Sequence, residues 1–180
     1  RMKWEDFDLR PQLHSSIAFP DCKLQFTNDF AFFLDQVATF FPAQINGFKK
    51  LLAAIDGHDA LNLERSSASA RGVVQEHISD PLLIDMIFCP LMFYGSATPR
   101  DMDFSQFVIM FKSIFCEGFG RPFDGIRLIL KRLVKHFKSL GGHLKLRAGV
   151  SEIVQRNGEA KAVVLDDGTE IDPNHTYMVA

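Results

Sequence analysis

Residues 126–142 read IRLILKRLVKHFKSLGG, and residues 143–171 read HLKLRAGVSEIVQRNGEAKAVVLDDGTEI. In the first stretch, apolar residues recur three and four positions apart, which is the period of a helix with one apolar face. These apolar positions are Ile126, Ile129, Leu130, Leu133, Val134, Phe137 and Leu140. Basic residues occupy the other side, at Arg127, Lys131, Lys135 and Lys138. We therefore expect a long amphipathic helix that ends at Gly141-Gly142, because glycine accepts the left-handed conformation that follows a helix.

The second stretch alternates β-forming residues with turn signals. Strands are expected at 143–147, 150–155, 160–165 and 176–179. Asn157-Gly158 and Asp167-Gly168 lie between such runs, where a two-residue hairpin turn needs positive φ angles. The long helix is therefore predicted to lead into a β-meander.

The residues before position 120 are predicted to be mainly helical. Pro11 and Pro20 divide residues 7–26 into two or three short strands. After these strands the apolar residues recur at helical spacing. Helices are expected over roughly 30–41, 42–57, 68–77, 81–92 and 104–115.

Several residues mark the ends of these helices. Thr27 or Asn28 is expected to cap the first helix, and Asp103 the last, because their side-chain oxygens can accept hydrogen bonds from free amides. Pro81 suits the first turn of a helix, where its missing amide costs little. Pro90 is expected to kink or break the same helix.

The glycines and proline of residues 118–122 (GFGRP) mark the best internal boundary, near residue 120. The sequence therefore predicts an α+β protein with two domains. Residues 1–120 form a mostly helical domain with short strands at 7–26. Residues 121–180 form the long helix and the β-meander.

Composition excludes several classes of function. The formal charge is -2, with 20 basic and 22 acidic residues, so no overall field favours nucleic acid. No apolar run approaches the roughly 20 residues of a membrane span, and we expect a soluble protein, cytoplasmic or in peripheral membrane contact. The three cysteines and six histidines lack metal-ligand spacing, so no metal site is expected.

No catalytic motif stands out in the sequence: G-x-S-x-G, H-E-x-x-H and the phosphate-binding P-loop are all absent, and no catalytic residue can be named. Phenylalanine is abundant, with 18 copies against one Trp and two Tyr. Such rings can line an apolar cavity, or they can fill the core of a helical domain.

The last third carries a family resemblance. Residues 121–126 (RPFDGI), a long helix, Gly141-Gly142, the strand beginning Val150-Ser151-Glu152-Ile153 and the hairpin with Asp167-Gly168 follow one another in that order. This order resembles the corresponding segment of the phytoene desaturases and flavin amine oxidases, which are FAD-dependent oxidoreductases. The helical part is similar, more loosely, to the substrate domain of that family.

The resemblance implies a cofactor and site residues. The main chain of Val150 would contact the adenine of FAD, and the turn with Pro122, Asp124 and Gly125 would lie near the flavin and the substrate. The family usually has paired glycines in this turn, where Asp124-Gly125 stands here. Candidates for an apolar substrate tunnel, with buried core as the alternative, are Phe88, Met92, Phe93, Phe107, Met110 and Phe111.

The family also binds the FAD pyrophosphate through a G-x-G-x-x-G loop, which does not occur in these residues. The resemblance therefore implies a fragment: the substrate domain and part of the FAD domain, partnered by the remainder of the same polypeptide. The implied substrate is an apolar small molecule such as an isoprenoid or an amine.

Two other functions fit the same sequence. The first is a non-catalytic module that binds an apolar ligand or a membrane surface, which predicts a closed fold with an internal cavity and no open sheet edge. The second is a helical domain whose apolar patches bind a protein partner.

Overall fold

The computed structural model describes residues 3–62 and 67–171. The chain folds as two units, Arg1–Ile126 (unit 1) and Arg127–Ala180 (unit 2). Helices combine with short antiparallel strands, which confirms the predicted α+β class.

Unit 1 contains short strands and most of the helices. In chain order its elements are η1 (Trp4–Phe7), β1 (Leu9–Pro11), β2 (Ser15–Phe19), β3 (Cys22–Phe26), α1 (Phe30–Phe40), η2 (Pro42–Gln44), α2 (Ile45–Asp56), α3 (Ala70–Gln75), α4 (Pro81–Met92), α5 (Phe104–Phe111), η3 (Lys112–Glu117) and β4 (Gly120–Pro122). From the unit boundary onward the elements are α6 (Ile126–Ser139), β5 (Val150–Arg156), β6 (Glu159–Leu165) and β7 (Glu170–Ile171).

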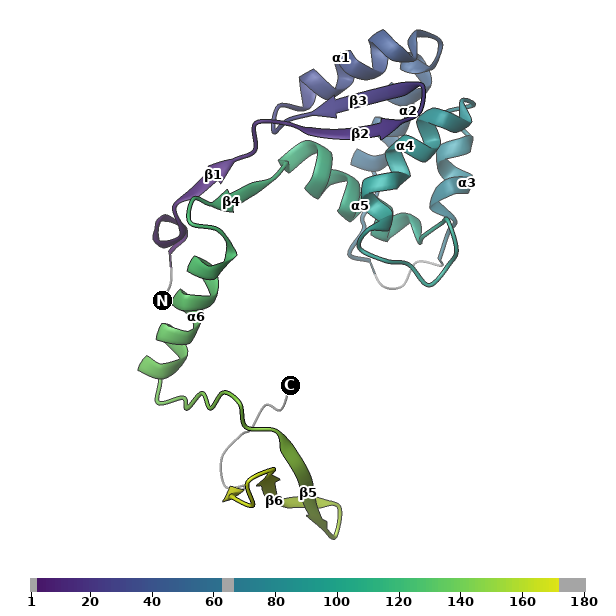
Figure 1. Ribbon diagram of the computed structural model, residues 1–180. Helices are drawn as coiled ribbons and strands as arrows, with labels where there is room; N and C mark the ends of the chain where they lie inside the picture. The colour runs from purple at the N-terminus through teal and green to yellow at the C-terminus, as the bar shows by residue number, and fades with distance from the viewer. Residues whose placement is uncertain (1–2, 63–66, 172–180) are drawn as a thin grey trace. The chain divides into compact units, whose positions relative to one another are not determined.

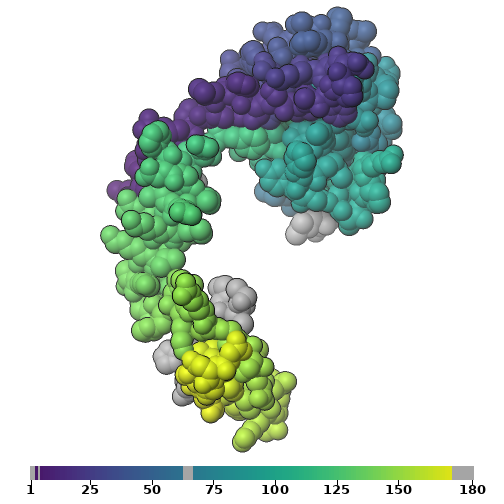
Figure 2. Space-filling model, viewed as in Figure 1, coloured from purple at the N-terminus to yellow at the C-terminus, as the bar shows by residue number. Residues whose placement is uncertain are grey.

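The hairpin of β2 and β3 is the centre of unit 1. Helix α1 packs against β3 and α4 against β2 (Figure 1). Ile17, Leu24 and Phe26 are buried on the hairpin. In the space-filling view the hairpin and the helices α1–α5 form one continuous body (Figure 2). The strands expected between residues 7 and 26 are confirmed.

Phenylalanine rings fill the core of this unit. Phe33 on α1 is fully buried, and its ring stacks on Phe115 with the centroids 4.5 Å apart. Phe26, Phe30 and Phe48 surround it at centroid distances of 6.0–6.2 Å. These edge-on and stacked contacts are the arrangements that aromatic rings prefer.

The cap of α1 is Asp29, so the predicted cap at Thr27 or Asn28 is wrong. The Asp29 side chain accepts a hydrogen bond from the Ala31 amide at 3.0 Å. The Thr27 hydroxyl instead accepts a hydrogen bond from the Asp29 amide. The Asn28 side chain holds both main-chain groups of Phe119, each at 3.0 Å. The Asn28 side chain, which the local sequence suggested as a cap, therefore binds the distant segment at Phe119 instead.

The two prolines of α4 act differently. Pro81 stands at the start of the helix, and the Asp80 side chain accepts hydrogen bonds from the amides of Leu82 and Leu83. Pro90 lies near the other end, and the helix runs through it to Met92. The proline therefore does not break the helix.

Helix α5 begins at Phe104 with Asp103 as its cap, as predicted. It does not continue as an α-helix to Phe115, because residues 112–117 form a π-helix, η3. The amide of Gly118 bonds the carbonyl of Ser113, five residues back. The wider turn places Ile114 and Phe115 in the core. Side-chain packing thus determines a helix type that apolar spacing alone does not distinguish.

Strand β4 pairs with β1 in antiparallel register, with Leu9 opposite Pro122 and Pro11 opposite Gly120. This pairing was not predicted. It ties residues 120–122 to the N-terminal part of unit 1. The two compact units divide after Ile126, a few residues past the boundary expected near residue 120.

Two aspartates clamp the start of α3 to the segment before α5. Asp101 accepts hydrogen bonds from the Ser69 hydroxyl at 2.6 Å and from the Arg71 amide at 2.9 Å. Asp103 accepts them from the Ser67 hydroxyl at 2.7 Å and from the Ala68 amide. The two carboxylates therefore fasten segments some thirty residues apart in sequence.

These contacts make the free energy of unfolding of unit 1 depend on pH in the acidic range. The Ser67 hydroxyl bond is the main cause that lowers the pKa of Asp103 below 3.8. Burial alone would raise the pKa of Asp101, but its hydrogen bonds with Ser69, Arg71 and Met102 outweigh burial and lower it. Because both folded values lie below the unfolded one, this stability is complete above the unfolded pKa. It is lost as the pH falls through the folded pKa.

The double variant Asp101→Asn/Asp103→Asn should therefore lose less stability than the unchanged protein when the pH falls from about 5 to about 3. Urea unfolding followed by far-UV circular dichroism at several pH values measures this slope. The matched control is Asp21→Asn/Asp35→Asn, which removes the same charge from exposed positions. If both double variants showed an equally reduced loss of stability at low pH, the role given to the hydrogen bonds of Asp101 and Asp103 would be contradicted.

Unit 2 has the predicted order of one helix followed by a meander. Helix α6 ends in a left-handed glycine, Gly141, with a φ of 85°. The amide of Gly141 bonds the carbonyl of Lys138, and that of Gly142 bonds the carbonyl of Phe137. This pair of bonds is the Schellman motif. The predicted glycine end is confirmed.

The meander β5-β6-β7 is antiparallel throughout. At the first turn, Asn157 and Gly158 have φ angles of 54° and 80°, as predicted for a two-residue hairpin. The strand expected at residues 143–147 is wrong, since these residues pair with no described strand. The strand expected at 176–179 lies outside the described residues.

Candidate functional site

Strand β5 is an edge strand of the sheet that the described residues form. Val150 lies opposite Leu165 on β6. The amide of Asp166 donates to the carbonyl of Gly149, so the residues next to Val150 and Leu165 form the hydrogen bond between the strands. In an antiparallel ladder this marks a pair that exchanges no hydrogen bonds itself. The N–H and C=O of Val150 therefore point away from β6, toward the open edge.

The neighbouring turn supports this assignment. The amide of Leu165 donates to the carbonyl of Thr169, and the carbonyl of Leu165 accepts from Gly168. Both main-chain groups of Leu165 thus bond main-chain groups of the turn after β6, and neither bonds the main chain of β5. Alternation along β6 gives Val163 the same direction, so its partner Ile153 also faces the open edge with its N–H and C=O. Two residues of β5 share this orientation.

A bulge next to Val150 shapes the strand. The register shifts between Val150 and Glu152, and Ser151 donates its hydroxyl toward the carbonyls of Val164 and Leu165 at 3.1 and 3.2 Å. Bulges re-aim a strand locally and occur frequently next to binding sites. Here the bulge separates Val150 from the regular part of the ladder.

Gly149 is a residue that sequence reasoning missed. A Cβ at this position would lie 2.0 Å from a carboxylate oxygen of Asp166. A larger residue here would require the Asp166 carboxylate to rotate away from the main chain beside Val150. The signal in the sequence was the glycine directly before the strand, which reads equally well as an ordinary turn residue.

The turn after β4 holds the three other candidates for cofactor contact. Pro122 is buried, Asp124 is exposed, and Gly125 has a φ of 79°. The amide of Gly125 donates to the carbonyl of Pro122 at 2.8 Å. The Phe123 amide donates to the carbonyl of Asp8, which fixes the turn to the start of β1. Pro122, Asp124 and Gly125 thus share one tight turn in unit 1, whereas Val150 belongs to unit 2.

The six candidates for substrate contact divide into three groups. Phe88, Phe107 and Phe111 are at most 1% exposed and pack ring on ring, with centroids 5.1 Å and 5.7 Å apart. Met92 and Met110 pack against this core from its edge. Phe93 is 83% exposed. The three buried rings therefore fill space by contacting one another, and the other three side chains remain accessible.

Two polar side-chain pairs next to this core were also missed. The His58 ring contacts the Ser105 hydroxyl at 2.9 Å and packs edge-on against Phe104. The guanidinium of Arg71 lies over the Phe88 ring at 4.7 Å and pairs with Asp85 at 2.8 Å. Side-chain pairs so far apart in sequence leave no local pattern. They brace the core of unit 1.

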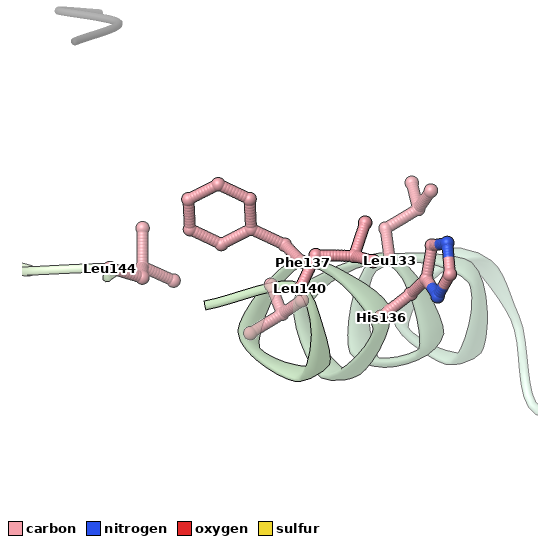
Figure 3. A pocket seen from close by; sticks show the side chains of 6 residues that line it. Leu133, His136, Phe137, Leu140 and Leu144 are labelled. Carbon is pink, nitrogen blue, oxygen red and sulfur yellow. The ribbon is translucent and has the colours of Figure 1, made fainter. Parts of the chain in front are cut away.

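Helix α6 has no buried residue. Its apolar stripe is open along its length, with Leu130 55% exposed, Phe137 48% and Leu140 74%. Leu144 joins Leu133, Phe137 and Leu140 around an apolar hollow (Figure 3). Gly142 allows this, because a Cβ there would lie 2.4 Å from the Phe137 ring. The stripe is thus a preformed apolar surface.

Within residues 3–62 and 67–171, no group of three or more His, Cys, Asp or Glu side chains is placed to hold a metal ion. Over the same ranges, no helix combines the length and apolar character needed to cross a membrane. No protein-family model matches the chain, and no curated protein is significantly similar to it.

Proposed function

We propose that the chain is part of an FAD-dependent oxidoreductase resembling the phytoene desaturases and flavin amine oxidases. Unit 1 would be its helical substrate part, and unit 2 would contribute β5 to the binding of FAD. The observation that carries the proposal is the main-chain edge at Val150, which pairs with no strand among the described residues.

This edge suits an adenine ring. The N–H and C=O of one extended residue point in the same direction, so they offer one donor and one acceptor side by side. Adenine carries an amino donor next to a ring-nitrogen acceptor. No special side chain is needed for such contact, which agrees with an apolar residue at position 150.

The open stripe of α6 supports a partial domain. In the described part of unit 2, the buried hydrophobic residues are Ala162, Val163 and Leu165. So few buried side chains make a marginal core for a unit of this size. The remainder of the same polypeptide would cover the stripe and supply the pyrophosphate-binding loop, which these residues lack. Gly118-Phe119-Gly120 cannot be that loop, because it leaves a π-helix and enters β4.

The flavin would supply hydride transfer when bound. The residues of this chain would bind and orient an apolar substrate and keep water away from it. Phe93, Met92 and Met110 are the accessible members of the substrate set. Phe88, Phe107 and Phe111 would support them from the core.

The substitution Val150→Pro tests the proposal in a polypeptide that carries this chain together with its dinucleotide-binding part. Proline removes the Val150 donor, and an edge position outside the ladder tolerates proline. Affinity for FAD, measured by quenching of flavin fluorescence, should fall at least about tenfold, the loss expected for one buried hydrogen bond.

The matched control is Ile153→Pro, which removes an equivalent edge amide from the same strand. It should leave FAD affinity within about twofold of the unchanged protein, a difference below half a kcal/mol. Two outcomes contradict the proposal: an unchanged protein that binds no flavin, and equal losses in the two variants.

A further inference from the structure

We infer that the basic face of α6 binds the anionic headgroups of a lipid membrane. This face, called the basic ridge, consists of Arg127, Lys131, Lys135 and Lys138. The inference concerns a surface that the proposed FAD site does not use.

The ridge lies on the side of α6 that the apolar stripe does not occupy. With 3.6 residues per turn, its four side chains fall within about 80° of one another around the helix axis. Their centre lies about 140° from the centre of the stripe formed by Leu130, Leu133, Phe137 and Leu140. A protein segment that covers the stripe therefore leaves the ridge facing outward.

The charged residues of α6 and of the segment that follows it are all basic. Residues 125–151 contain seven basic residues and no Asp or Glu. All 22 acidic residues of the chain lie elsewhere, against 20 basic residues in total. A nearly neutral protein thus concentrates positive charge on one helix and its following segment, which favours an anionic partner there.

The ridge is available for such a partner. All four side chains are exposed. None of them forms an ion pair with another described residue. Basic side chains that lack a carboxylate neighbour have no anion of the same chain competing with an external one.

The shape favours a membrane over nucleic acid. The ridge is straight, one side chain wide and about 16 Å long. Interfaces with nucleic acid bury roughly 600 Å² or more even for single modules, which exceeds such a ridge. A planar surface of anionic headgroups needs only a line of basic groups and adds attraction with each one.

The test uses co-sedimentation of the whole chain with vesicles. We expect binding to vesicles of phosphatidylcholine mixed with phosphatidylglycerol, weak binding to phosphatidylcholine alone, and release by salt. Replacing Arg127, Lys131, Lys135 and Lys138 together by glutamine should weaken binding at least about tenfold. Glutamine is a good helix former, so α6 should persist, and circular dichroism checks this.

The matched control replaces four exposed basic residues outside the ridge, Lys23, Lys49, Lys50 and Arg121, by glutamine. It carries the same net charge and should bind anionic vesicles as the unchanged chain does. Equal binding to both vesicle types, equal losses in the two variants, or equally tight binding to a DNA duplex would overturn the inference. Flavin takes no part in the readout, so its outcome is separate from that of the FAD test.

Discussion

Replacing Phe33 by alanine should lower the free energy of unfolding of unit 1 by about 3–5 kcal/mol. Phe33 is fully buried and contacts the rings of Phe26, Phe30, Phe48 and Phe115. Truncation removes apolar area from the core and also leaves a cavity that the rigid neighbouring rings cannot fill. A loss of this size is a large part of the stability of an ordinary domain.

Urea unfolding followed by far-UV circular dichroism measures the effect of Phe33→Ala. The midpoint should fall while the dependence on urea concentration stays unchanged, because a similar surface is exposed on unfolding. Phe93→Ala is the matched control: this ring is 83% exposed, and its loss should change stability by less than about 0.5 kcal/mol. A change below about 1.5 kcal/mol for Phe33→Ala would show that the ring is not central to the core.

The substitution Gly47→Ala should destabilise unit 1 by about 1–3 kcal/mol. Within a helix this change ordinarily stabilises by roughly 0.5–1 kcal/mol, since alanine is the better helix former. Here a Cβ would lie 1.9 Å from the main-chain carbonyl oxygen of His77. Main chain cannot rotate aside as a flexible side chain can. Either α2 or the segment between α3 and α4 must therefore shift.

The matched control for this reversal of sign is Gly57→Ala, at the end of the same helix. Gly57 has a φ of -77°, which alanine adopts readily. Its added Cβ would meet one carbonyl oxygen at 3.4 Å. Thermal unfolding compares the stabilities of the two variants directly. If Gly47→Ala were as stable as Gly57→Ala, the close approach of α2 to residue 77 would be refuted.

The parts of the fold that local chemistry determines could be predicted from the sequence. Four of these parts depend only on neighbours within a few residues: the apolar stripe of α6, the glycine end of α6, the strands β2 and β3, and the Asn157-Gly158 turn. The orientation of Val150 has a similar origin, because the hairpin register and the following turn fix which main-chain groups pair with β6. The resemblance nominated the residue, and the ladder shows where its polar groups point.

The features that could not be predicted depend on distant contacts. Asn28 binds the main chain of Phe119 instead of capping α1. The π-helix η3 places Phe115 in the core, where its ring stacks on that of Phe33. Apolar spacing also cannot separate a ring that touches substrate from one that fills the core. The buried positions of Phe88 and Phe107 could therefore not be deduced from the pattern alone.

The pairing of β1 with β4 has a consequence for folding during synthesis on the ribosome. Leu9–Pro11 is synthesised long before its partner Gly120–Pro122, because nearly the whole of unit 1 lies between them. Loop closure over such a length delays the contact, since synthesis proceeds at roughly 5–20 residues per second. During those seconds the early strand offers its edge to any extended chain nearby. Chaperones that shield nascent strands would matter most in this interval.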